Sequence, residues 1–158
     1  MIRNLSVFLL SLIVSSVILT YFWREGLQMQ YTMLFKPAAM YVYKLLGIHK
    51  SGIRLVIEHF TSLIPYIALC ISLPNAPWKR RIIYLGYGLG IIILVHFILI
   101  IAISKVYSVY SGSETAYKFM VPMFILNDSL PLIIWFLFFY REIISLFKRE
   151  KATASEHS

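Results

Sequence analysis

The fold of this chain is decided by residues 82–103, which read IIYLGYGLGIIILVHFILIIAI. A helix needs about 20 consecutive apolar residues to cross the hydrocarbon core of a bilayer, and this stretch has His96 as its only strongly polar residue. Three further segments have similar length and character: Leu5–Trp23, Ile53–Pro74 and Phe119–Tyr140. The sequence therefore predicts an all-α integral membrane protein with four transmembrane helices.

The composition supports a polytopic membrane protein. Of the 158 residues, 59% are hydrophobic and 14% are charged. The net charge of +8 would also suit a nucleic-acid-binding protein, but the basic residues flank apolar spans, as at Lys79–Arg81 and Lys148–Lys151. Membrane topology and anionic lipids explain this placement better than DNA does. We therefore expect membrane lipids and a protein partner in a membrane complex, and no nucleic acid.

Cysteine and histidine usage argues against a metal centre. Cys70 is the single cysteine, so neither an intrachain disulfide nor a cysteine metal cluster can form. The four histidines have none of the tight spacings of a zinc site. No phosphate-binding glycine loop and no Gly-x-Ser-x-Gly motif is present. We expect neither a metal nor a cofactor.

The density of basic residues predicts the orientation. The short connection Asn75–Arg81 holds three basic residues, and the tail after Tyr140 holds four. Such segments stay in the cytoplasm, so both termini are expected there, in a cell membrane such as the bacterial inner membrane. In the outward segment, Tyr31–Ile48 resembles an amphipathic interfacial or re-entrant helix that stops at Gly47. We expect one membrane domain over residues 1–150 and a disordered tail over residues 151–158.

Five polar residues lie in or at the edge of the apolar segments: Glu58, His59, His96, Asn127 and Asp128. An ionisable side chain at membrane depth is costly, so it marks a functional site or a partner buried in protein. At about 1.5 Å per residue, His96 lies about 10 Å, Asp128 about 14 Å and Glu58 about 8 Å from the outer ends of their spans. The sequence therefore predicts a polar cluster within one layer of the outer leaflet.

Each of these residues also has a structural interpretation. His96 can be a hydrogen-bonded packing residue, and Glu58–His59 can mark the interface, where water still reaches. Asn127–Asp128 can cap a half-helix that breaks before Pro131. The glycines of Gly86–Gly90 are typical of close helix packing.

Residues Lys36–Tyr140 resemble the exosortase/archaeosortase family, membrane-embedded, transpeptidase-like enzymes that process proteins with a C-terminal sorting signal. The resemblance rests on four features: Pro37-Ala38-Ala39, the helix end Leu45-Leu46-Gly47-Ile48, the Pro-ended helix and basic turn Leu73–Arg81, and the late pair Asn127-Asp128. The stretch 49–56 corresponds to a short extracytoplasmic excursion in the family. The resemblance implies a helical membrane scaffold with its chemistry near the outer face.

The family's chemistry uses a cysteine, an arginine and a histidine, and this chain lacks all three at the corresponding positions. Aligning the spans puts Glu58 at the cysteine position, His96 near an asparagine and Leu99 near the arginine. Asn127 takes the place of the histidine, and Asp128 matches the aspartate that follows it. Thiolate attack needs sulfur, and the oxyanion would lack its positive charge. The resemblance thus implies a pseudoenzyme, a non-catalytic accessory or structural subunit of a membrane complex.

Two other functions remain open on the sequence. The first is an intramembrane enzyme or a proton- or ion-handling protein that uses Glu58, His59, His96 and Asp128. The second is a small subunit of a respiratory, photosynthetic or secretion assembly, in which the polar residues bind a pigment or quinone or only pack.

Overall fold

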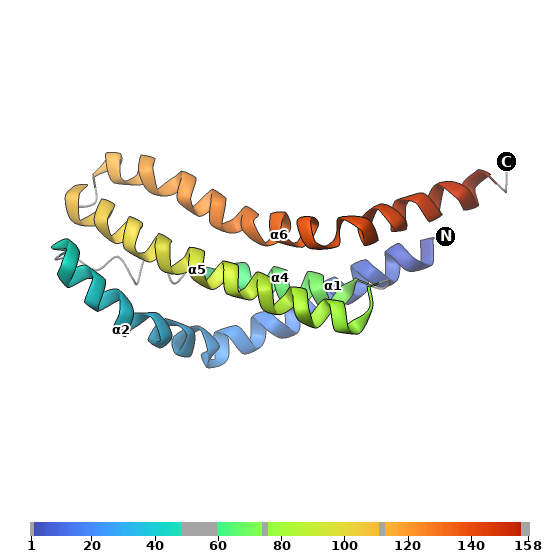
Figure 1. Ribbon diagram of the computed structural model, residues 1–158, viewed down its shortest axis with the longest axis horizontal. Helices are drawn as coiled ribbons and strands as arrows, with labels where there is room; N and C mark the ends of the chain where they lie inside the picture. The colour runs from blue at the N-terminus through green and yellow to red at the C-terminus, as the bar shows by residue number, and fades with distance from the viewer. Residues whose placement is uncertain (1, 49–59, 74–75, 111–112, 156–158) are drawn as a thin grey trace.

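The computed structural model describes residues 2–48, 60–73, 76–110 and 113–155. Within these residues every regular element is a helix (Figure 1). The elements in chain order are α1 (Ile2–Phe22), the π-helical turn η1 (Trp23–Leu27), α2 (Gln28–Leu46), the 3-10 turn η2 (Phe60–Ser62), α4 (Leu63–Ser72), α5 (Trp78–Tyr110) and α6 (Glu114–Ser155).

Three helical stretches are long and apolar enough to cross a membrane: Ser6–Leu46, Trp78–Tyr110 and Glu114–Ile144. The described residues are all-helical, as expected, and these three stretches are compatible with a membrane protein. The fourth predicted span, Ile53–Pro74, is represented in the described residues by η2 and α4. With 10 residues, α4 is about 15 Å long, which is half of the hydrocarbon thickness.

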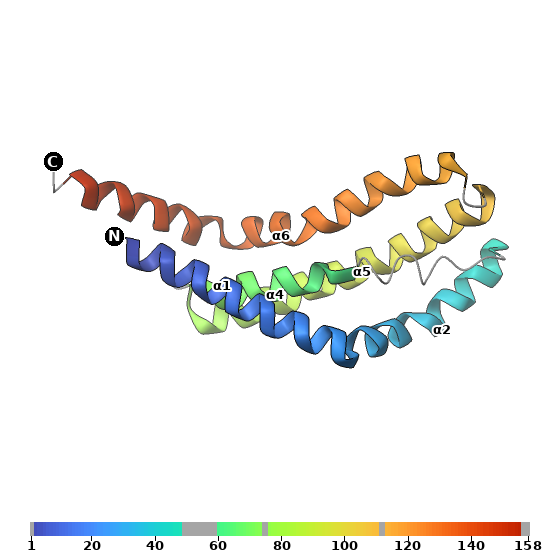
Figure 2. The ribbon, with the colours of Figure 1, turned by 180° about the vertical axis from the view of Figure 1, so that it is seen from behind.

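The connection between α1 and α2 differs from the expectation. The sequence predicted a transmembrane span and a separate interfacial helix. The two helices run into each other through η1, and the bend lies at Gly26, whose φ is 153°. Figures 1 and 2 show the resulting bent rod along one side of the molecule. The predicted helix stop at Gly47 is confirmed, because its φ of 62° lies in the left-handed region and its N–H caps Tyr43 O.

The interpretation in which Asn127–Asp128 cap a half-helix that breaks before Pro131 does not hold. α6 continues through Pro122 and Pro131, and its backbone leaves helical values only at Phe139 (φ −115°, ψ 16°). Prolines are tolerated inside membrane helices where neighbouring helices support the backbone. Asn127 and Asp128 therefore lie inside a helix and do not cap one. α6 also extends to Ser155, so residues 151–155, predicted as disordered tail, are helical; lysine and alanine there favour a helix.

Two apolar clusters form the core, one toward each end of the bundle. The first cluster joins α1, α4, α5 and α6, and its buried members include Trp23, Leu63, Ile64, Tyr66, Cys70, Ile92, Ile134 and Phe139. The second cluster joins α2, α5 and α6, and its buried members include Phe35, Ala39, Tyr43, Leu99, Ile100, Ile103 and Met120. Burial of these side chains holds the helices together.

Close contact between α4 and α5 depends on a single glycine. A Cβ on Gly88 would overlap the Tyr66 side chain, whose hydroxyl donates a hydrogen bond to Tyr84 O at 2.6 Å. The predicted role of the glycines in close packing therefore holds at Gly88. Gly86 and Gly90, which form the Gly-x-x-x-Gly pair, have no neighbouring atom within 4 Å of the position that a Cβ would take.

Candidate functional site: a buried histidine between four helices

His96 lies near the middle of α5 and is fully buried, with 0% exposure. One turn before it Ile92 belongs to the first apolar cluster, and one turn after it Ile100 belongs to the second. The histidine therefore marks a polar layer between the two halves of the core. A buried polar ring in such surroundings requires hydrogen-bond partners.

Both ring nitrogens of His96 have a hydroxyl partner. The Tyr31 hydroxyl lies 2.6 Å from Nδ1, and Ser62 Oγ lies 2.7 Å from Nε2. The Tyr31 and His96 rings also meet edge to face, with 5.8 Å between their centroids. In a neutral imidazole one nitrogen donates a hydrogen bond and the other accepts one. One of the two hydroxyls therefore accepts a hydrogen bond from the ring, and the other donates a hydrogen bond to it.

The fourth helix contributes Asn127. Its side chain is 1% exposed and is a further hydrogen-bond partner of His96. Its Nδ2 also donates to Asp128 Oδ1 at 3.3 Å. We use the name His96 cluster for Tyr31, Ser62, His96 and Asn127, which come from α2, η2, α5 and α6 respectively.

Local structure fixes the two hydroxyl partners. Tyr31 lies one turn after the Gly26 bend, and its ring is held between Trp23 at 5.4 Å and Phe35 at 4.8 Å, measured between centroids. Ser62 is the last residue of η2, directly before α4, and is 2% exposed. Tyr31 is thus presented to α5 just after a bend, and Ser62 by the 3-10 turn that leads into α4.

The structure brings together two of the five predicted site residues. His96 and Asn127 are buried and in contact with each other. Asp128 accepts a hydrogen bond from Asn127, but its side chain is exposed. Glu58 and His59 lie outside the described residues. Leu99, at the position that the family resemblance gives to an arginine, is buried in the second apolar cluster.

Sequence reasoning missed Tyr31 and Ser62. Serine and tyrosine hydroxyls are common in membrane helices and near their ends, so neither residue stands out as His96 does. The usable signal was the polar Thr61-Ser62 pair directly before the apolar run of α4.

The His96 cluster can connect helices and share protons along hydrogen bonds. Among the described residues, no group of three His, Cys, Asp or Glu side chains is placed to hold a metal ion. A second buried hydroxyl pair, Tyr43 and Ser104 at 2.7 Å, ties α2 to α5 further along the bundle. Near the opposite end, Arg80 Nη1 pairs with Glu142 Oε1 at 2.6 Å and ties α5 to α6.

Comparison with known proteins adds no relative. No protein-family model matches the chain, and neither a curated protein nor a solved structure matches it.

Proposed function

We propose that the chain is a non-catalytic, exosortase-like membrane protein that serves as an accessory or structural subunit of a membrane protein complex. The observation that carries this proposal is the burial of the His96 cluster. His96 and Ser62 are 0% and 2% exposed, and both ring nitrogens are bonded to hydroxyls of the same chain. A buried histidine that is bonded at both ring nitrogens within its own chain suits the joining of helices better than contact with a substrate.

The outer surface of α1 and α2 supports a role in assembly. In the most apolar window of Ser6–Leu46, 6% of residues are buried, compared with 33% for Trp78–Tyr110 and 17% for Glu114–Ile144. The N-terminal rod is therefore the span least covered by its own chain. Its exposed apolar side chains must contact lipid or another protein.

For the topology we propose four crossings with both termini in the cytoplasm of a bacterial cell. The start of α1 and the end of α6 lie at the same end of the molecule (Figures 1 and 2). An even number of crossings accounts for this arrangement, with α4 in the second crossing and α2 on the outer side. The basic segment Lys79–Arg81 favours the cytoplasm for the end at which α5 begins.

Photo-crosslinking in native membranes tests the assembly role. A photoreactive amino acid is placed at Leu10 or Val17, each 64% exposed on α1, and at Leu137, 65% exposed on α6, as the matched control. We expect a defined protein adduct at the α1 positions that co-purifies in constant proportion after mild solubilisation. Lipid adducts alone at both α1 positions, together with a monomer after purification, would contradict the proposal.

A second candidate function rests on the order of the hydrogen bonds at His96. Ser62 Oγ, His96 and the Tyr31 hydroxyl form the sequence of nucleophile, base and orienting group that activated serines use. This arrangement favours an intramembrane enzyme or a proton-handling role over a pigment- or quinone-binding subunit. Labelling by a fluorophosphonate that is lost in Ser62→Ala and retained in Thr61→Val would establish the enzyme. We expect no labelling of the wild-type protein, because Ser62 is buried.

A further inference from the structure

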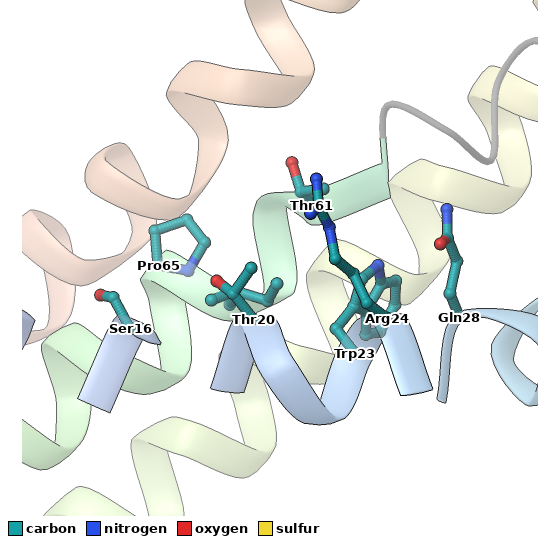
Figure 3. A pocket seen from close by; sticks show the side chains of 8 residues that line it. Ser16, Thr20, Trp23, Arg24, Gln28, Thr61 and Pro65 are labelled. Atoms are coloured by element: carbon teal, nitrogen blue, oxygen red, sulfur yellow. The ribbon is translucent and has the colours of Figure 1, made fainter. Parts of the chain in front are cut away.

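A pocket with both polar and apolar lining residues lies beside the His96 cluster, at the bend between α1 and α2 (Figure 3). Its volume is about 530 Å³, and it is bounded on one side by α1, η1 and the first residue of α2, and on the other by η2 and the first turn of α4. The lining includes Ser16, Thr20, Trp23, Arg24, Gln28 and Thr61. Trp23 separates the pocket from the cluster, since its ring packs on Tyr31 at 5.4 Å.

Four of the lining residues form a polar stripe along the N-terminal rod. Ser16, Thr20 and Arg24 follow one another at intervals of four residues, which places them on one face of the helix, and Gln28 follows after the bend at Gly26. Figure 3 shows them on the side of the rod that faces η2 and α4, with Arg24 reaching toward Thr61. The stripe adds polar side chains to a rod whose exposed surface is largely apolar.

Arg24 is the charged member of the pocket lining. The ion pairs of the described residues are Arg80–Glu142 and Lys118–Glu114, so the guanidinium has no carboxylate partner among them. An arginine stays charged at every physiological pH, and its planar fork of N–H donors fits a phosphate group in two-pronged fashion. The hydroxyls of Thr20 and Thr61 and the Gln28 amide supply further donors around the same space.

The depth of Arg24 matches the level of lipid phosphates. The helix before it, α1, has 21 residues, which corresponds to about 31 Å and to the hydrocarbon thickness of about 30 Å. If α1 starts at one face of the bilayer, Arg24 reaches the headgroup layer of the other face. The side chains next to the pocket on α1, such as Val17 and Ile13, are apolar and exposed, and they offer a track for an acyl chain.

We propose that this pocket binds the phosphate headgroup of an anionic phospholipid. The phosphate oxygens accept hydrogen bonds from the Arg24 guanidinium, from Gln28 and from the Thr20 and Thr61 hydroxyls. The acyl chains lie along the apolar surface of α1. The proposal is independent of the assembly role, since a lipid can occupy the pocket of a monomer as well as that of a subunit.

Native mass spectrometry of the purified full-length chain in detergent tests this site. Dioleoyl phosphatidylglycerol is titrated against dioleoyl phosphatidylcholine, and inorganic phosphate is added as a competitor. The variants are Arg24→Gln, the near-isosteric Thr20→Val, and Lys36→Gln, which removes an exposed charge of α2 outside the pocket as the matched control. Thermal unfolding confirms that each variant is folded.

We expect one tightly held phosphatidylglycerol per chain, which phosphatidylcholine and inorganic phosphate do not displace. Arg24→Gln should weaken its binding by about tenfold or more, the loss typical of a charge-assisted hydrogen bond. Thr20→Val should weaken it by a smaller factor, and Lys36→Gln should leave it unchanged. Equal binding by Arg24→Gln and the wild type would overturn the proposal. Displacement by inorganic phosphate would also overturn it, because the site would then take a free anion.

Discussion

A histidine whose two ring nitrogens are bonded to hydroxyls of two other helices fixes those helices relative to its own. In this chain the hydroxyls belong to Tyr31 and Ser62, which are separated from His96 by 65 and 34 positions in the sequence. Apolar side chains pack in many registers, whereas a hydrogen-bonded ring accepts only one. The His96 cluster therefore specifies the register of the bundle between two apolar clusters that would otherwise tolerate sliding.

Replacing His96 by leucine tests this role. His96→Leu deprives the partly buried Tyr31 hydroxyl and the buried Ser62 hydroxyl of their shared partner, and we expect a loss of about 2–4 kcal/mol in the free energy of unfolding. Adding Tyr31→Phe and Ser62→Ala to the same chain should recover part of this loss, because fewer buried polar groups then lack a bond. Unfolding in mixed detergent micelles, followed by circular dichroism, gives the values.

Asp128→Asn is the control for the His96 variants, because Asp128 is exposed beside the cluster. Its effect should stay within about 0.5 kcal/mol. A His96→Leu variant as stable as Asp128→Asn would show that the cluster does not hold the helices together.

Gly88 offers a second test at the scale of one residue. Gly88→Ala places a methyl group against the Tyr66 side chain, and we expect a loss of about 1–3 kcal/mol in stability. Gly86→Ala and Gly90→Ala meet no neighbour and should raise stability by about 0.5–1 kcal/mol, the usual gain of alanine over glycine inside a helix. Thermal unfolding of the three variants under one condition separates the two outcomes. Equal effects at all three positions would mean that α4 and α5 are not in close contact at Gly88.

At the scale of elements, the bend at Gly26 brings the first part of α2 to the His96 cluster. Its φ of 153° is open to glycine but strained for other residues. The bend turns α2 so that Tyr31 meets α5, whereas a straight continuation of α1 would carry it elsewhere. The angle between α1 and α2 thus determines whether the His96 cluster forms.

Gly26→Ala should open this bend and lower stability by about 1–3 kcal/mol. Spin labels at Val14 on α1 and Met40 on α2, both exposed, report the angle through their separation. We expect their mean distance to lengthen in Gly26→Ala and to stay the same in Gly86→Ala, which changes a glycine far from the bend. An unchanged distance in Gly26→Ala would show that contacts with α4 and α5, and not the glycine, set the angle.

The helices that the sequence predicted are those whose apolar run alone exceeds the bilayer thickness. Predicting α5 and α6 required no tertiary information, because an apolar segment of this length that crosses a membrane satisfies its backbone hydrogen bonds by forming a helix. The bend at Gly26 and the unbroken course of α6 through Pro131 depend instead on neighbouring helices, which a local pattern does not contain. For the same reason His96 and Asn127 were recognisable as candidates, while Tyr31 and Ser62 became partners only through the fold.

At the scale of the whole molecule, the helices lie along a common long axis (Figures 1 and 2). The direction of the chain reverses from the α1–α2 rod to α4, from α4 to α5 and from α5 to α6. α5 starts at the end that holds the beginning of α1, and it turns into α6 at the opposite end. The two ends differ in the density of basic residues, because Lys79–Arg81 are consecutive at the first end, whereas Lys44, Lys105 and Lys118 are spread out near the second. This asymmetry predicts that the two ends face different compartments.

Cysteine labelling with a membrane-impermeant maleimide tests the orientation in intact cells. Lys79→Cys and Ser113→Cys each introduce one exposed thiol, and Cys70→Ala removes the buried native thiol from both. Because basic segments stay in the cytoplasm, Ser113→Cys should react in intact cells and Lys79→Cys only after permeabilisation. The opposite pattern would invert the topology and move the Arg24 pocket to the cytoplasmic leaflet. Labelling of both thiols in intact cells would mean that the long axis of the helices does not cross the bilayer.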